Sequence, residues 1–180
     1  MDTLAKKSIC LRRTFQVGDA KEGGANRKPG KKIVEATAYV CGLGFYEFSL
    51  NGKKMGNSEF APLWSDYDKT VYYNTYDVTE QLRRGENVVG ILLGNGFYNV
   101  QGGRYRKLQI SFGPPTLLFE LVINYEDGTC TTVHSDNNWK YDFSPVTFNC
   151  IYGGEDYDAR REQKGWNQIG FDDSHWRPVV

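Results

Sequence analysis

Residues 85–94 read GENVVGILLG, a nearly continuous apolar run about as long as one β-strand. β-branched side chains pack well on a pleated surface, and a strand that is apolar on both faces is typical of the interior of a β-sandwich. The run therefore predicts a buried strand in the middle of an all-β fold.

Short strands with frequent turn signals flank this run on both sides. We predict them at residues 11–17, 33–40, 45–50, 53–55, 71–76, 116–125, 129–134, 139–141 and 145–152. Asn51-Gly52 and residues 126–128 predict hairpin turns, since Asn and Gly tolerate the positive φ of a type I′ turn. A short helical turn, capped by Asp77 or Thr79, is expected at 77–82. Many short strands and no convincing amphipathic helix of twelve residues indicate an all-β, antiparallel β-sandwich of the jelly-roll type.

The length of the chain suits one domain. A chain of 180 residues can bury roughly two-thirds of its unfolded surface, so it needs no disulfide or metal to fold. Residues 18–32 contain four glycines, one proline and a basic surplus without periodicity. We therefore predict a single β-sandwich over residues 1–180 with a flexible loop at about 18–32.

Charge and hydropathy exclude several classes of partner. The 22 basic and 22 acidic residues balance, so no basic excess favours nucleic acid or anionic lipid. No apolar run approaches the ~20 residues of a membrane span, and the N-terminal residues lack the apolar core of a signal peptide. We expect neither a nucleic-acid partner nor a membrane span.

The four cysteines, Cys10, Cys41, Cys130 and Cys150, are well separated in the sequence. None forms a C-x-x-C pair, and the chain has two histidines, so a zinc site is not expected. Two disulfides are compatible with this spacing, but buried free thiols are the favoured interpretation. The sequence does not fix the oligomeric state.

Several ordered segments resemble the N-terminal domain of bacterial α-L-rhamnosidases, which is related to galactose-binding-like and rhamnose-binding modules. They are residues 39–53, 61–67, 71–79, 85–99, 151–160, 165–166 and 171–179. The most specific combination is LGNGFYN at 93–99 with YGGEDYDAR at 152–160. The resemblance covers roughly residues 33–180.

This resemblance implies a fragment of a longer, inverting glycoside hydrolase whose catalytic (α/α)6 barrel is absent here. An inverting site needs two carboxyl groups roughly 6.5–9.5 Å apart, and we expect no catalytic residue in this chain. The leading interpretation is an accessory domain that packs on the barrel of an enzyme cleaving terminal α-L-rhamnosyl residues, in an extracytoplasmic (periplasmic or secreted) location. The alternative is an autonomous binding module for L-rhamnose or rhamnosylated glycans, with calcium as the cofactor. A catalytic domain in its own right is disfavoured.

Candidate site residues lie in the two most specific segments. Amides and carboxylates bond sugar hydroxyls and aromatic rings cover C–H faces, so we predict carbohydrate contacts at Asn95, Tyr98, Asn99, Tyr152 and Glu155. The calcium-dependent binders among related domains suggest Asn99, Asn149 and Glu155 as oxygen ligands, because calcium accepts six to eight oxygens. The alternative is that Asn95 and Asn99 hold turns or cap loop backbone, as asparagine commonly does.

Three other groups of residues have a structural interpretation. Arg160 is expected to pair with a neighbouring carboxylate and lock residues 152–160, in a structural or interdomain role. Residues 66–68 are expected to form a turn, with Trp64 packed over the edge of the sandwich. Trp166 and Trp176 are expected in the core or in an interface.

Overall fold

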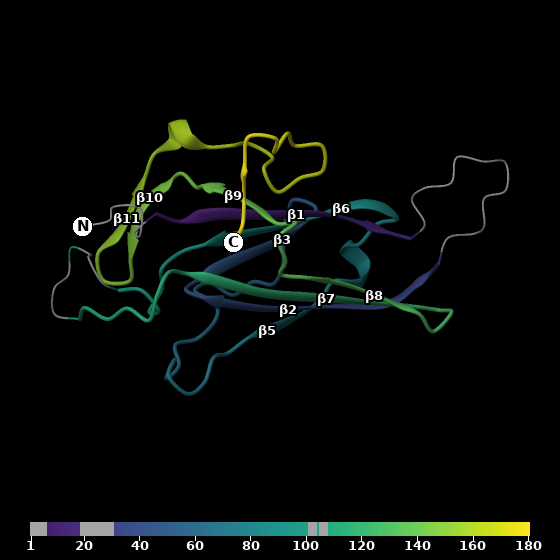
Figure 1. Cartoon of the computed structure of the whole chain (residues 1–180), viewed down its shortest axis with the longest axis horizontal. Coiled ribbons are helices and arrows are strands. Elements are labelled where there is room, and N and C mark those ends of the chain that lie inside the picture. The colour runs from purple at the N-terminus through teal and green to yellow at the C-terminus, as the bar shows by residue number, and fades with distance from the viewer. Residues whose placement is uncertain (1–6, 19–30, 101–103, 105–107) are drawn as a thin grey trace.

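Two antiparallel sheets pack face to face in the computed structural model, which describes residues 7–18, 31–100, 104 and 108–180 (Figure 1). The first sheet has the order β12-β9-β1-β6-β3-β4. Its strands are β1 (Ile9–Val17), β3 (Tyr46–Leu50), β4 (Lys53–Lys54), β6 (Gly85–Leu93), β9 (Lys140–Phe143) and β12 (Arg177–Pro178). The described residues contain no α-helix, so the predicted all-β, antiparallel sandwich is confirmed.

The second sheet has the order β5-β2-β7-β8. Its strands are β2 (Ile33–Leu43), β5 (Asn74–Asp77), β7 (Thr116–Tyr125) and β8 (Cys130–His134). A separate hairpin joins β10 (Val146–Cys150) to β11 (Gly154–Tyr157), and two 3-10 turns, η2 (Thr79–Gln81) and η3 (Ala159–Arg161), complete the elements. The β3–β4 turn has φ of 54° at Asn51 and 84° at Gly52, as the Asn-Gly signal predicts.

The core lies between the sheets and is bridged by edge-to-face aromatic contacts. The Phe119 ring of β7 lies 5.7 Å from Phe48 of β3 and 5.3 Å from Trp139, measured between ring centroids. From the central strand β6, Val89, Ile91 and Leu93 point into this core and are fully buried. Such aromatic pairs add to the free energy gained by removing apolar area from water.

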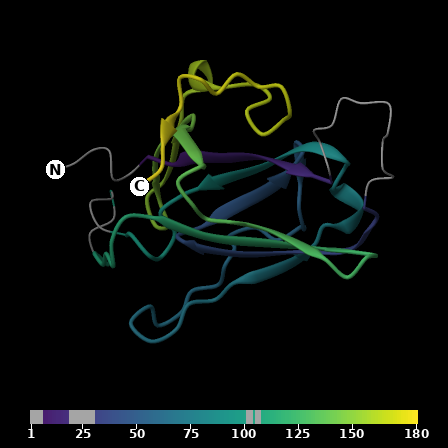
Figure 2. The same ribbon diagram turned by 45° about the vertical axis from the view of Figure 1, so that its right-hand side comes forward.

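Strand β6 is apolar on both faces because the C-terminal segment covers its outer side. A Cβ added to Gly90 would meet Asn167 Cβ at 2.6 Å and the Trp166 ring at 3.1 Å. The segment lies across the outside of β1 and β9 (Figure 2). Trp176 is buried and stacks on half-buried Trp166 with ring centroids 6.1 Å apart, which confirms their predicted core or interface positions.

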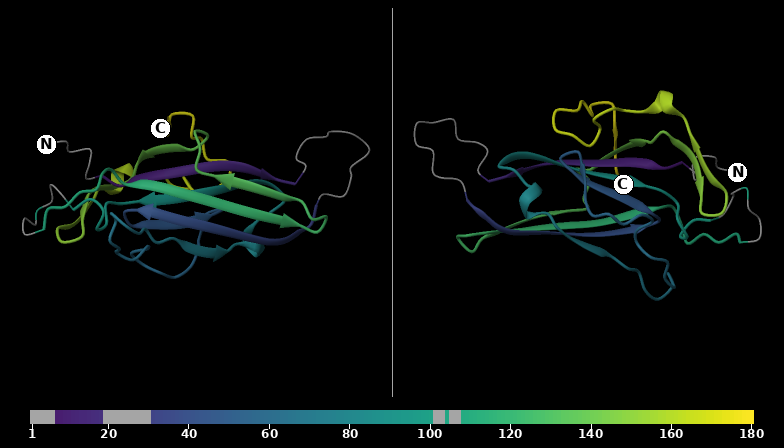
Figure 3. Two further views of the ribbon diagram at one scale, coloured as in Figure 1. Left: turned by 60° about the horizontal axis from the view of Figure 1, so that its bottom comes forward. Right: turned by 180° about the vertical axis from the view of Figure 1, so that it is seen from behind.

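Among the described residues, no comparable segment covers the outer face of the second sheet along its length. Seen from below, β2, β7 and β8 lie in front with their outer surface exposed (Figure 3, left). The two outer faces of the sandwich therefore differ: the chain itself covers one of them, and the other is available for contacts.

The structure corrects several predicted strand limits and the burial of one cysteine. The predicted strand at 71–76 is shorter, because pairing with β2 begins at Asn74 and residues 71–73 are exposed outside the sheet. The predicted loop at 152–160 contains a short strand that the sequence did not predict, β11. All four cysteines are free, but Cys130 is exposed rather than buried. Most of the predicted loop at 18–32 lies outside the described residues.

Candidate functional site

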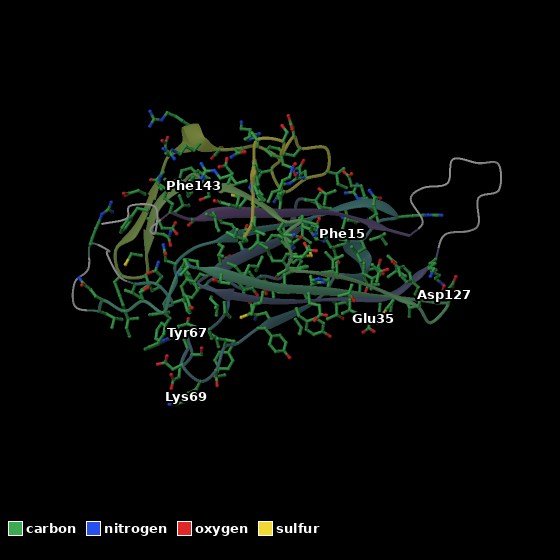
Figure 4. All side chains as sticks on the ribbon, in the orientation of Figure 1. Phe15, Glu35, Tyr67, Lys69, Asp127 and Phe143 are labelled. Carbon is green, nitrogen blue, oxygen red and sulfur yellow. The ribbon has the colours of Figure 1, made fainter. Side chains whose placement is uncertain are left out.

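Three connections converge at one end of the sandwich, which we call the loop end: residues 56–73, the part of 94–115 that the structure describes, and residues 150–153. Figure 4 labels Tyr67 and Lys69 there, far from Asp127 at the tip of the β7–β8 hairpin. Every predicted site residue lies in these connections or in the adjoining hairpin β10–β11. The loop end is thus the candidate functional site.

A buried amide cluster forms the base of the loop end. The Asn149 Oδ1 atom accepts hydrogen bonds from the backbone N of Asn95 at 2.7 Å and from its Nδ2 at 2.9 Å. Asn99 Nδ2 donates to Asn95 Oδ1 at 2.8 Å, and Asn149 Nδ2 donates to Ser8 Oγ at 2.9 Å. All four residues are buried, and Asn95 is 0% exposed. The cluster ties the β6 loop, β10 and the start of β1 together.

This geometry matches the alternative in which the asparagines hold loop backbone. Asn95 and Asn99 also share a backbone bond from Asn99 N to Asn95 O at 3.2 Å, as in a tight turn. Glu155 pairs with Asn149 in the β10–β11 ladder, but it is exposed. The Oδ1 atom of Asn149 already accepts two amide protons from Asn95, so a cation at this oxygen would compete with these bonds. The described residues contain no cluster of three His, Cys, Asp or Glu side chains, and calcium held by Asn99, Asn149 and Glu155 stays a prediction.

An exposed aromatic cluster lies above the amides. The Trp64 ring stacks on Phe97 with centroids 5.0 Å apart and planes 17° apart, and Tyr152 meets Phe97 edge-on at 6.1 Å. Phe97 also contacts Phe45, which in turn contacts Phe60. Trp64 thus packs on a ring of the loop after β6 and is 61% exposed, rather than over a strand at the edge of the sandwich. The sequence interpretation missed Phe97 and Phe60, although Phe97 lies in the quoted LGNGFYN segment.

A groove of about 620 Å³ opens beside Trp64. It is lined by Trp64, Ser65, Asp66, Tyr67, Asp68, Tyr72, Phe97, Leu108, Ile110 and Phe112. The predicted turn at 66–68 is present, since Lys69 N and Thr70 N donate to Asp66 O at 2.9 and 2.8 Å. Of the predicted sugar contacts, Tyr98 packs against the groove residue Tyr67 with ring centroids 5.1 Å apart, whereas Tyr152 contacts Phe97; neither lines the groove itself. Rings beside carboxylates are a combination that can bind a sugar.

The segment at 152–160 contains the predicted ion pair between Arg160 and a neighbouring carboxylate, at its C-terminal end. Arg160 donates to both carboxylate oxygens of Asp158, from Nε at 2.8 Å and from an Nη atom at 2.9 Å, as predicted. These hydrogen bonds lower the pKa of Asp158 to about 2. A carboxyl group with that pKa is ionised at neutral pH and cannot serve as a general acid, which needs a raised pKa.

Most of the large exposed apolar side chains gather at the loop end and on the adjoining half of the second sheet. They are Tyr39, Phe60, Leu63, Trp64, Val71, Tyr72, Tyr73, Ile110, Phe112, Leu118 and Tyr152. Contiguous apolar surface of this kind usually marks a contact with another molecule or domain.

Comparison with known proteins gives one consistent family. The model of the α-L-rhamnosidase N-terminal domain matches residues 31–180. An α-L-rhamnosidase from Formosa agariphila is 47% identical over 150 residues, covering 81% of this chain and 16% of that protein. One from Streptomyces avermitilis is 40% identical over 154 residues, covering 85% and 15%. This chain thus spans about a sixth of these relatives.

Solved structures agree on the fold. The crystal structure of the Streptomyces avermitilis α-L-rhamnosidase complexed with L-rhamnose superimposes with a TM-score of 0.85 at 35% identity, covering 97% of this chain and 16% of that one. The α-L-rhamnosidase from Dictyoglumus thermophilum gives 0.80 at 36% identity, covering 97% and 17%. A lectin from Pleurotus ostreatus in complex with GalNAc shares the fold alone, at 0.57 and 15% identity. No helix among the described residues is long and apolar enough to cross a membrane.

Proposed function

The chain belongs to the family of α-L-rhamnosidase N-terminal domains, and from this premise we propose that it serves a longer α-L-rhamnosidase as a non-catalytic accessory domain packed on the catalytic part. The observation that carries the proposal is the match over residues 31–180 in a chain that spans about a sixth of its relatives. The residues that cleave the glycosidic bond then lie in the rest of the enzyme, which acts on terminal α-L-rhamnosyl groups outside the cytoplasm.

The chemistry of the loop end supports a non-catalytic role. Inverting hydrolysis needs one carboxylic acid and one carboxylate on opposite sides of the scissile bond. Asp158 is held ionised by Arg160, and Glu155 is exposed on the hairpin surface. This pair therefore has no member suited to protonate a leaving group.

The apolar tips of the loop end are suited to pack on the catalytic part. The side chains of Phe60, Leu63 and Trp64 are each more than half exposed and lie on one loop. Large aromatic and aliphatic side chains of this kind are the usual anchors of protein interfaces. Covering them by the rest of the enzyme would remove an apolar surface that a free domain leaves in water.

We expect the 180-residue chain to leave an aryl α-L-rhamnoside intact under conditions in which the full-length enzyme cleaves it. The full-length variant Glu155→Gln should keep its kcat within about twofold of wild type, because this carboxylate takes no part in the proposed chemistry. Release of the aryl group, followed by absorbance, measures both. Turnover by the isolated chain, abolished by Glu155→Gln, would contradict the proposal.

A second candidate function is carbohydrate binding at the loop end. The observation that favours it is the stacked Trp64–Phe97 pair beside the carboxylates of Asp66 and Asp68. An aromatic platform with nearby acceptors can cover the C–H face of L-rhamnose and bond its hydroxyls. Calcium held by Asn99, Asn149 and Glu155 stays a prediction within this candidate.

Calorimetry with millimolar L-rhamnose, in calcium and then in EDTA, tests the second candidate. If calcium carries the binding, EDTA abolishes the heat and Glu155→Gln weakens the affinity at least tenfold. Glu126→Gln, an exposed carboxylate on the β7–β8 turn, is the matched control and should bind like wild type. Absence of heat in calcium at millimolar sugar would exclude L-rhamnose binding at the loop end.

A further inference from the structure

We propose that a second groove, on the outer face of the second sheet, binds a neutral oligosaccharide. This sheet groove has a volume of about 670 Å³ and lies between the loop end and strand β8. The residues that line it include Tyr39, Val71, Tyr73, Leu118, Glu120 and His134. It is separate from the groove beside Trp64, which has its own lining.

Strand register places the polar members of the sheet groove in one row. Tyr39 of β2 is the partner of Glu120 in β7, and Glu120 is the partner of His134 in β8. Directly opposed residues in antiparallel strands project on the same face, and neighbouring strands lie about 4.8 Å apart. The row therefore crosses three strands and spans roughly 10 Å, enough for more than one sugar ring.

Two tyrosine rings extend the row toward the loop end. Tyr73 precedes β5 and is 63% exposed, and its ring centroid lies 6.1 Å from that of Tyr39 at an interplanar angle of 59°. Leu118 of β7 is 53% exposed and pairs with Cys41 of β2, so it lies next to the row, one step nearer the loop end. The groove thus combines apolar side chains and two phenol hydroxyls with a carboxylate and an imidazole.

This combination of aromatic rings and polar groups suits the two kinds of surface on a pyranose ring, its C–H faces and its hydroxyls. Aromatic rings cover the C–H faces, while carboxylate and imidazole groups exchange hydrogen bonds with hydroxyls. Within the part of the chain that the structure describes, the side chains of Glu120 and His134 are exposed and make no ion pair or hydrogen bond with another residue. Both are therefore available to a ligand.

The same residues argue against a protein surface in the sheet groove. Interface cores are depleted of charged side chains, and a protein partner that covered Glu120 would have to supply a cation or a hydrogen-bond donor in place of its water. A sugar replaces that water with its own hydroxyls. Farther along the same face, outside the groove, the next row holds Thr37, Val122 and Thr132, in which two threonines flank one half-buried valine.

Titration of the 180-residue chain with rutinose, a neutral disaccharide with a terminal α-L-rhamnosyl group, tests this inference. The choice of sugar rests on the proposed function. We expect calorimetric binding at millimolar concentration, weakened at least tenfold by Tyr39→Ala and by His134→Ala. Thr132→Ala, two residues from His134 on the same strand and face, should bind like wild type. Glu120→Gln, which keeps the shape of its side chain, should also weaken binding.

Three results would overturn the inference. The first is absence of binding in a chain whose thermal unfolding shows it to be folded. The second is binding that survives Tyr39→Ala and His134→Ala but is lost in Trp64→Ala, which would place the sugar at the loop end. The third is slow hydroxyl-radical labelling of Tyr73 in the sugar-free full-length enzyme, which would show the groove covered by protein. The accessory-domain proposal is tested by a different measurement. It fails if this chain alone hydrolyses a rhamnoside, whatever the result of the sugar titration.

Discussion

Asp173→Asn is expected to lower the free energy of unfolding by about 3 kcal/mol. The guanidinium of Arg12 on β1 is buried, with Arg12 only 2% exposed, and it is paired with the Asp173 carboxylate of the C-terminal segment. It also donates to Gln168 O at 3.2 Å. Removing the counter-charge leaves a buried cation uncompensated, which typically costs 3–5 kcal/mol. We expect the lower end because the Asp173 side chain is 22% exposed.

Urea denaturation followed by tryptophan fluorescence measures this loss, because Trp166 and Trp176 lie in the same segment. Asp172→Asn is the matched control: its carboxylate is exposed and accepts from Ser174 N at 3.0 Å, and we expect a much smaller change. If Asp173→Asn and Asp172→Asn lowered the free energy of unfolding equally, the buried Arg12 guanidinium would not need the Asp173 carboxylate for its stability. The ion pair attaches the segment that covers the outer face of the first sheet, so proteolysis within 158–176 should accelerate in Asp173→Asn alone.

Much of the fold follows from local sequence signals. β7 runs over the residues predicted for it, and β6 and the Asn51–Gly52 turn also follow the signals read from the sequence. β11 was missed because its four residues, GEDY, are all exposed and carry no apolar alternation. Its partner β10 alone holds it as a strand, and no local pattern reports that pairing.

The candidate site was predictable in composition but not in geometry. The sequence shows that Asn95, Asn99 and Asn149 are polar residues near predicted strands, but an amide that binds a ligand and an amide that binds another amide look the same. Their burial depends on contacts between β10 and the β6 loop that are distant in sequence. The row of Tyr39, Glu120 and His134 likewise depends on the register of three strands.

Asn149→Ala distinguishes the two roles of the amide cluster, and we expect it to lower the free energy of unfolding by about 2–4 kcal/mol. The change leaves the backbone N of Asn95 without its acceptor and removes the donor to Ser8 Oγ, in a site that excludes water. Each buried polar group left unsatisfied costs about 1–3 kcal/mol. Because these bonds join protein groups, the same loss is expected in EDTA and in calcium.

Denaturant unfolding in both conditions provides the measurement, and Asn138→Ala provides the control. Asn138 is an exposed asparagine whose side chain bonds Asp136, so its loss should change stability by about 0.5 kcal/mol or less. If Asn149 also serves as a calcium ligand, calcium would stabilise the wild type but not Asn149→Ala, so the stability loss would be larger in calcium than in EDTA. A stability loss independent of calcium makes the asparagines the base that holds the loop end, and leaves ligand recognition to the aromatic and carboxylate side chains above them.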